Sequence, residues 1–520
     1  MKHGLSRQSS SLRQLLDLLG RDYPKRRIGL VVLAASLAYG ISGLPGFGVA
    51  LLISVALIGC FYIWQLSALR FIDARIKATL GETRGWNVHT KYYPLYKFVD
   101  IYRAAQRFAA QQPRSVELLS EHRFPLGTIL HGLSHAAGRA LTTPTYIARN
   151  IGYDEEIYLP TDSFWLIRSQ PGAPFGPGVL RVWLPARNGY VHLEVATKRA
   201  SDAQLVLDSI AELASTHSIY RNRMIRMVFG PEVRSEYGED ESMEPTDLIF
   251  YKDQPVADGD IILDETHRAI IERTIIDFHQ RRDQLLQLGI PGKRGVLFYG
   301  PPGTGKTYTC KYIAHRLSTA TAIVVTGHAL LHMKAICAIA KMLQPALVLL
   351  EDVDLVFAQR DNNAYNTVLG EFIDQLDGFG DTDQIIFILT TNAIERIESA
   401  IKDRPGRVSQ CVYFGPPSAT LRQRYLDALV QPYDASSVDL PQVVRQTEGV
   451  SQAFLKELVF RAVQIASGQT SHNGATLGLT DEHFDTALRE MTSSNGRIAQ
   501  RIIGFRMDAE RRADTRDSQT

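Results

Sequence analysis

The chain has 520 residues, which at roughly 150 residues per domain predicts about three domains. Hydrophobic residues make up 45% and charged residues 22%, an ordinary balance that excludes a wholly disordered chain. The 57 basic and 55 acidic residues leave a net charge of +2, so no nucleic acid is expected as a partner. Four cysteines exclude a disulfide scaffold, and none belongs to the CxxC pair of a zinc ribbon: Cys60, Cys310, Cys337 and Cys411.

Segment 28–69 contains no Asp, Glu, Lys, Arg or His. It is about twice as long as one membrane-spanning helix. Pro45 interrupts the segment, which predicts two helices joined as a transmembrane hairpin. Basic residues flank both ends, so both ends, including the N-terminal segment 1–27, are expected on the cytoplasmic side. A buried helical pair in a soluble protein is the alternative.

The next two parts differ in pattern. Residues 71–150 are predicted to be a mostly helical connector, and residues 151–235 a small α/β domain. In the second part, apolar residues alternate over 179–184 and 190–195 around Asn188-Gly189, which predicts a β-hairpin.

A helix and a further strand are expected to follow this hairpin. Ser201 and Gln204 form a capping box that would open the helix, and 223–229 is expected to be another strand. Residues 236–258 are expected to be a linker and 506–520 a polar tail. Five cationic or imidazole side chains in this region could bind an acidic partner or lie on a solvated face: His192, His217, Arg221, Arg223 and Arg226.

The first chemical motif is a glycine-rich loop. The apolar segment 295–299 predicts a strand, which runs into Gly-Pro-Pro-Gly-Thr-Gly-Lys-Thr over 300–307 and then into a helical segment. This is the GxxxxGK[ST] pattern in the strand–loop–helix context that it requires. Backbone N–H groups would surround phosphate oxygens, Lys306 would reach the β and γ phosphates, and Thr307 would ligate Mg²⁺.

Two further apolar strands end in polar residues. Segment 346–350 runs into Glu351 and Asp352, a pair suited to holding a metal's water shell and activating a water molecule. Segment 385–389 precedes Asn392, whose amide could position that water.

Two arginines follow the third strand, in the turn Arg-Pro-Gly-Arg at Arg404 and Arg407. They suit contact with the phosphates of a neighbouring subunit.

These motifs occur in order and together resemble the AAA ATPase module over about 259–465, with support from Leu-Asp-Gly at 376–378 and Thr-Glu-Gly-Val-Ser at 447–451. The resemblance implies a parallel αβα P-loop sandwich over 259–430, a helical lid over 431–505, and assembly as a ring, usually a hexamer.

The resemblance also implies residue roles. Glu351 and Asp352 would be the Walker B pair, with Glu351 and Thr307 near Mg²⁺, Asn392 the sensor, and Arg404 and Arg407 the trans-acting fingers. The ATP-binding set would be Gly300, Pro301, Pro302, Gly303, Thr304, Gly305, Lys306, Thr307, Tyr308, Ile261, Ile262 and Gly449.

Three features depart from the usual AAA pattern. The Walker B pair has the order Glu then Asp, and 326–345 carries no aromatic–glycine pore loop; both features resemble the mitochondrial AAA translocase of the Rieske protein. Two membrane helices are predicted where that subfamily has one. The Rieske client is therefore not carried over.

The sequence favours a membrane-anchored ATPase that remodels or translocates a protein client. The alternative is an ATP-gated oligomeric switch or scaffold at the membrane with slow hydrolysis. A fused zinc protease is disfavoured, because no histidine is followed by glutamate as HExxH requires. A bacterial-type inner membrane with a cytoplasmic ATPase is the expected location, and the mitochondrial inner membrane is the alternative.

Overall fold

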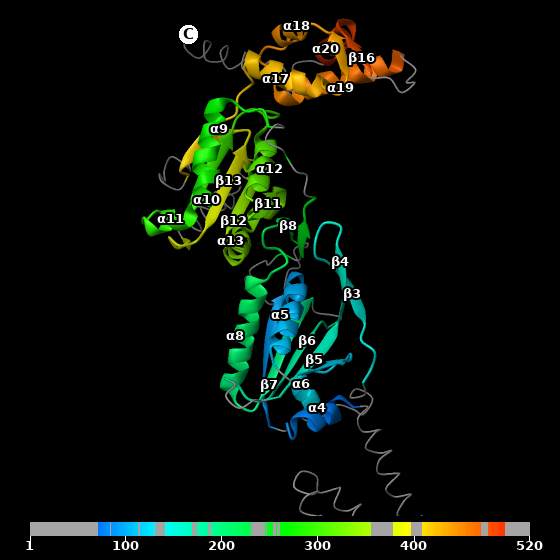
Figure 1. The fold of residues 1–520 in the computed structure, drawn as a ribbon, viewed down its shortest axis with the longest axis vertical. Coiled ribbons are helices and arrows are strands. Elements are labelled where there is room, and N and C mark those ends of the chain that lie inside the picture. The colour runs from blue at the N-terminus through cyan, green and yellow to red at the C-terminus, as the bar shows by residue number, and fades with distance from the viewer. Residues whose placement is uncertain are drawn as a thin grey trace, which may run out of the picture.

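A computed structural model describes residues 71–83, 85–112, 115–130, 141–168, 174–185, 189–229, 245, 247–252, 256, 261–354, 378–396, 408–469 and 477–493. Along the long axis, Figure 1 shows a smaller sheet with its helices, a larger sheet with its helices, and a helical group. Within these ranges, no helix is both long and apolar enough to cross a bilayer. The predicted hairpin at 28–69, both predicted arginine fingers and the predicted tail lie outside the described residues.

The smaller sheet is wholly antiparallel, with the order β1-β7-β6-β5-β2. Its strands are β1 (Asn87–Pro94), β2 (Val116–Leu119), β5 (Asp162–Ile167), β6 (Gly178–Trp183) and β7 (Tyr190–Thr197). Helices α5 (Phe98–Ala110) and α8 (Ala200–Thr216) share one apolar cluster with the sheet, and α4 (Ile72–Leu80) and α6 (Leu126–Leu130) share another. A two-stranded ribbon, β3 (Tyr146–Asn150) with β4 (Glu156–Pro160), extends toward the larger sheet (Figure 1).

The hairpin predicted at 179–184 and 190–195 is confirmed as β6 and β7. The segment 71–150, predicted to be a mostly helical connector, contains α4, α5 and α6 and also supplies β1 and β2, the two edges of the sheet. Its helix α5 is amphipathic and covers the sheet formed by the later strands.

The predicted capping box is not formed. Helix α8 begins at Ala200, before Ser201, and its N-cap residue makes no side-chain cap. Asp202 instead accepts a hydrogen bond from the Gly176 backbone N–H at 2.9 Å, which ties the helix start to the loop before β6. A tertiary contact has therefore replaced the local one.

One charged cluster is buried under the smaller sheet. Arg181 on β6 lies opposite Glu194 on β7 and is fully buried, and Asp162 at the start of β5 binds the same guanidinium. Two backbone carbonyls, of His122 and Phe124, complete the arrangement. The guanidinium thus joins three strands to the loop that leads into α6.

The larger sheet has the order β14-β10-β13-β12-β11-β8-β9 and is parallel except for β9. Its strands are β8 (Met224–Val228), β9 (Asp247–Phe250), β10 (Arg294–Tyr299), β11 (Thr321–Thr326), β12 (Ala346–Glu351), β13 (Ile385–Thr391) and β14 (Gln410–Tyr413). The associated helical segments are α9 (Glu265–Ile271), η2 (Glu272–Ile276), α10 (Asp277–Gln280), α11 (Arg282–Gln287), α12 (Lys306–Arg316), η3 (Gly327–Leu331), α13 (Met333–Met342) and η4 (Ile394–Arg396).

Alternate side chains of this sheet face two separate cores. On β10, Val296 and Phe298 join a cluster with α12 and η2, whereas Leu297 joins a cluster with α13. Strands buried on both faces are typical of parallel sheets covered by helices. The predicted α/β P-loop sandwich is confirmed at this level.

The edge beyond β11 differs from the prediction. Segment 223–229, assigned from sequence to the small α/β domain, forms β8 of the larger sheet, and the predicted linker contains β9. Ile225 and Met227 on β8 are buried in the same cluster as α13. Burial against a helix more than 100 residues later in the chain decided this placement.

Arg221 joins the two sheets where the chain passes between them. It donates to Ser215 O at 2.7 Å at the end of α8, and to the carbonyls of Met342, at 3.0 Å, and Gln344 beyond α13. Asp100 on α5 accepts from Ser218 Oγ at 2.6 Å just before this crossing.

The five basic side chains that the sequence grouped together therefore lie in different environments. Arg221 makes this bridge, and His192 packs edge-on against Tyr92 and Trp183. The other three side chains are exposed: His217, Arg223 and Arg226.

The C-terminal group is helical and has its own core. It comprises α17 (Ala419–Val430), α18 (Leu440–Gln446), α19 (Gln452–Gln469) and α20 (Asp481–Ser493), with a short parallel pair of strands, β15 (Asp434–Ser437) and β16 (Gly478–Thr480). Leu426 and Val430 of α17 belong to this core. The sequence placed α17 in the nucleotide-binding unit, but its apolar face packs with the lid.

Candidate nucleotide site

The glycine-rich loop lies between β10 and α12, as its sequence predicts. Gly300, Gly303 and Gly305 all have positive φ, at 143°, 76° and 92°. A side chain at Gly300 would collide with the chain after β14, because its Cβ would lie 2.1 Å from Phe414 O. The loop therefore requires glycine both for its backbone shape and for the close approach of Phe414.

Lys306 is buried at the centre of this loop. Its Nζ donates to Gly300 O and Pro301 O, each at 2.8 Å. Burial lowers the pKa of Lys306 to about 8, and the negative charges of Asp352 and Asp354 act against this shift. A phosphate would give this ammonium group a charged acceptor in place of neutral carbonyls.

The next two predicted residues occupy the first turn of α12. Thr307 and Tyr308 are both exposed, Tyr308 by 45%. Thr304, just before the turn, is buried and donates from Oγ1 to Pro301 O at 2.8 Å. The loop thus stabilises its own shape and leaves the hydroxyl of Thr307 accessible for a metal ion.

The acidic pair Glu351 and Asp352 lies at the carboxyl end of β12. Glu351 is half-buried, and burial, followed by repulsion from Asp352, raises its pKa. Asp352 has a left-handed backbone, with φ 51°. Among residues with side chains, Asp and Asn tolerate this conformation best, which suits the Glu-Asp order found here.

Asn392 at the end of β13 contacts Asp352 directly. Its Nδ2 donates to Asp352 Oδ1 at 3.0 Å, and Thr390 Oγ1 accepts from the Asp352 backbone N–H at 3.0 Å. Strands β10, β13 and β12 are adjacent and parallel, so their polar carboxyl ends meet at one edge of the sheet. The structure therefore brings the loop, the acidic pair and the amide together.

Sequence reasoning did not assign a role to Asp354. This side chain is 5% exposed, and its Oδ1 accepts from Thr391 Oγ1 at 2.9 Å and from the Asn392 backbone N–H at 3.0 Å. The only sequence signal was a second acidic residue two positions after Asp352. Its partners lie 37 and 38 residues further on, which no local pattern indicates.

The lid rests on the glycine-rich loop. Ala453 on α19 donates from its backbone N–H to Gly303 O at 3.0 Å, and Ser451 packs against the same glycine. Gly449, two residues before Ser451, has φ 77° and turns the chain into α19. Ser451 is thus a loop contact that the sequence showed only as part of the motif opening a helix.

The two isoleucines expected near the adenine differ in exposure. Ile261 is buried in the cluster that contains α12, whereas Ile262 is half-buried. Nearby, the ring of His267 stacks on Phe414, with centroids 5.6 Å apart. Ile262 is therefore the more accessible candidate for contact with a base.

Residues 296–416 match the family model described as "ATPase family associated with various cellular activities (AAA)". The chain contains an AAA ATPase domain. The match starts in β10 and extends past β14, so it covers the loop, the acidic pair and Asn392 of the candidate site.

Three curated relatives are similar over part of the chain. The ATP-dependent zinc metalloprotease FtsH 2 of Thermoanaerobacter sp. (strain X514) is 29% identical over 54% of this chain and 55% of its own length. A 26S proteasome regulatory subunit 8 homolog of Schizosaccharomyces pombe is 28% identical, over 42% and 57%. The proteasome-activating nucleotidase of Thermococcus onnurineus is 28% identical, over 44% and 60%. The chain therefore spans little more than half the length of these relatives.

The segment after β11 in the AAA domain is mostly core. Leu330 and Met333 are buried in the cluster beneath α13, and Leu331 packs against it, whereas His328 is exposed. These apolar side chains lie in the segment 326–345, which carries no aromatic–glycine pore loop, and they support the sheet.

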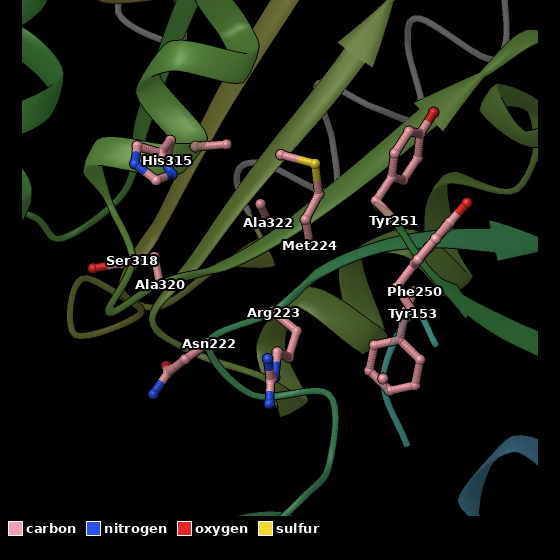
Figure 2. Close-up of a pocket in the computed structure, with 12 residues that line it drawn as sticks. Tyr153, Asn222, Arg223, Met224, Phe250, Tyr251, His315, Ser318, Ala320 and Ala322 are labelled. Atoms are coloured by element: carbon pink, nitrogen blue, oxygen red, sulfur yellow. The ribbon is translucent and has the colours of Figure 1, made fainter. Parts of the chain in front are cut away.

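A pocket lies at the other end of α12, away from the glycine-rich loop. It has a volume of about 150 Å³. Figure 2 shows Tyr153 from the β3–β4 turn, Arg223 at the start of β8, and His315 near the end of α12 around it. The pocket lies between the larger sheet and the turn of the β3–β4 ribbon and is separate from the nucleotide site.

Proposed function

We propose that this protein is a membrane-anchored AAA ATPase that hydrolyses ATP to remodel or translocate a protein client. The observation that carries the proposal is the contact of Asn392 with Asp352 beside the loop of Lys306. A base, an amide that orients it and a cation for the phosphates are what phosphoryl transfer to water requires.

The site is suited to ATP with Mg²⁺. The positive-φ glycines turn the loop around a space for phosphate, and α12 begins at Lys306 with its N–H groups directed toward it. Thr307 and Glu351 would hold Mg²⁺, partly through water. When bound, the metal ion would stabilise negative charge on the phosphates. Ile261, Ile262, Tyr308 and Gly449 are the proposed contacts of the nucleoside.

Hydrolysis would use the residues at the ends of β12 and β13. Asp352 takes a proton from water as the water oxygen bonds to the γ phosphorus. The bond from that phosphorus to the β–γ bridging oxygen breaks, and ADP leaves with the electron pair. Lys306 stabilises the charge on the phosphates, and Arg404 and Arg407 of a neighbouring subunit would do the same in a ring, which we propose to be a hexamer.

Membrane anchoring is proposed from the uncharged segment 28–69. The three relatives are named as a zinc metalloprotease, a regulatory subunit of the 26S proteasome and a proteasome-activating nucleotidase. This likeness favours action on a protein client. A bacterial-type inner membrane is the proposed location, with the mitochondrial inner membrane as the alternative.

An ATP-gated switch or scaffold is the second candidate. It is favoured by the short Asp352 side chain, which reaches less far than the usual glutamate. Such a protein would bind ATP and assemble, yet hydrolyse it slowly.

Two variants separate these candidates. Asp352→Asn is expected to bind ATP without cleaving it, and Lys306→Ala is expected not to bind it; Lys456→Ala, on the exposed face of α19, is the control. Each full chain is purified in detergent, its ATP turnover is measured, and co-purifying proteins are identified by mass spectrometry.

A remodelling ATPase predicts client-stimulated turnover in the wild type and in Lys456→Ala, with the client retained by Asp352→Asn and not by Lys306→Ala. Identical partners for all variants would contradict an ATP-gated client. ATP-dependent assembly without stimulated turnover would favour the switch.

A further inference from the structure

The ends of β12 and β13 are linked by side chains at three consecutive positions. Thr390, Thr391 and Asn392 each bond to the Walker B turn, through the Asp352 N–H, Asp354 Oδ1 and Asp352 Oδ1. Asp354 lies at the centre of this set, because its Oδ1 also accepts from the Asn392 backbone N–H. The Asp354 carboxylate therefore holds the side chain of Thr391 and the backbone of Asn392, and the side-chain amide of Asn392 contacts Asp352.

Burying a carboxylate at this position is costly unless its bonds compensate. Asp354 is 5% exposed, and its Oδ1 receives two donors from the adjacent strand. Asp352 has a left-handed backbone, with φ 51°, a conformation that few residues with a side chain adopt. The bonds to residues 390–392 oppose relaxation of this turn, so its geometry depends on the link to β13.

We propose that Asp354 is a positioning residue for ATP hydrolysis, an inference that rests on the proposed function. Its carboxylate fixes Thr391 and Asn392, so that the Asn392 amide donates its hydrogen bond to Oδ1 of Asp352. This arrangement assigns Oδ2 of Asp352 to the attacking water. Asp354 itself acts through its neighbours and touches neither water nor nucleotide.

The test separates placement from charge. A displacement of about 1 Å at a catalytic group can cost on the order of 100-fold in rate. Asp354→Ala removes the acceptor and should lower kcat by roughly 10- to 100-fold. The KM for ATP should change little, because the glycine-rich loop is held by its own carbonyls and by the lid.

Asp354→Asn is the conservative partner of this variant. Its amide oxygen can still accept from Thr391 and Asn392, so it should restore kcat to within a few fold of the wild type. The charge of Asp354 also acts on Lys306. If that charge were its role, Asp354→Asn would be as impaired as Asp354→Ala and would show a raised KM.

Steady-state turnover of the full chain is measured for both variants beside Asp381→Ala, a control at an exposed carboxylate in the same domain. If Asp354→Ala does not fold, Thr391→Val and Thr391→Ser replace it. The first removes one donor to Asp354 and should lower kcat, whereas the second retains the hydroxyl and should not.

Reduced kcat with unchanged KM in Asp354→Ala, restored in Asp354→Asn, supports the proposal. Turnover at the wild-type level in Asp354→Ala, or equal loss in both variants, overturns it. A wild-type chain that binds ATP but shows no turnover would instead refute the proposed ATPase function, and with it this role for Asp354.

Discussion

Replacing Arg181 by methionine is expected to destabilise the smaller domain by about 3–5 kcal/mol, the usual cost of removing one partner from a buried ion pair. All five N–H donors of Arg181 are engaged. Nε and Nη2 bind Asp162 at 2.8 and 2.7 Å, and Nη1 binds Glu194 at 3.1 Å. Nη1 and Nη2 each also donate to a backbone carbonyl, of Phe124 and His122, at 2.7 Å.

The magnitude follows from what remains after the substitution. Asp162 and Glu194 are 2% and 1% exposed, and burial already raises the pKa of both. Without the guanidinium they would be buried carboxylates facing two carbonyls that have lost their donor. They would take up protons more readily, so the penalty should shrink as the pH falls.

Tryptophan fluorescence during urea unfolding of the full chain measures this effect. Trp86, Trp165 and Trp183 belong to the smaller domain, and the other tryptophan, Trp64, lies in the predicted membrane hairpin. The larger sheet and the lid contain none. The signal therefore follows the unfolding of the domain that contains Arg181.

Arg199→Met is the matched control. The Arg199 side chain is 67% exposed and pairs with Asp202 at 3.0 Å, so its loss should cost less than about 1 kcal/mol. A cost for Arg181→Met equal to that of Arg199→Met would refute the reasoning. Recovery of stability on adding Asp162→Asn and Glu194→Gln would support it.

Two further predictions concern pH and the nucleotide loop. Burial raises the pKa of Asp100 to about 6 from 3.8, despite bonds from Ser218 and Ile219 and the nearby charges of Lys97 and Arg103. The folded state thus binds the proton more tightly than the unfolded state, and stability falls as the pH rises from about 4 to 6. Asp100→Asn should remove up to about 3 kcal/mol of that change. The measurement is the difference between the unfolding free energies of the variant and the wild type in urea at each pH. An unchanged slope would contradict this. Gly300→Ala should abolish binding of a fluorescent ATP analogue, because its Cβ would lie 2.1 Å from Phe414 O. Gly468→Ala, whose Cβ would lie in open space on α19, should bind the analogue normally. Equal binding by both variants would be inconsistent with the close approach of Phe414.

The sequence was most informative where function depends on residues close together in the chain. The glycine-rich loop requires positive φ at Gly300, Gly303 and Gly305, and this requirement is visible directly as glycine. The alternation in β6 and β7 predicted a hairpin because both strands and their turn are contiguous. The Glu351-Asp352 pair was recognisable because it ends an apolar strand.

Local patterns were weaker guides to which sheet a strand joins. The segment that forms β8 has the composition of a strand in either sheet. Strand β9 is short and lies within a polar segment, so the sequence did not predict it as a strand. The burial of Ile225 and Met227 against α13 assigned them to the larger sheet. Similarly, α17 follows the AAA strands in sequence, but Leu426 and Val430 pack with the lid.

The sequence by itself determined that the chain carries a nucleotide loop, an acidic strand end and a following amide, since each is a contiguous motif with its own backbone or chemical requirement. Only the tertiary structure decided that Asp354 holds Asn392 against Asp352, and that Arg221 joins the two sheets. The physical reason is that these contacts join groups 38 to 121 residues apart, and packing of the strands and helices brings them within hydrogen-bond distance.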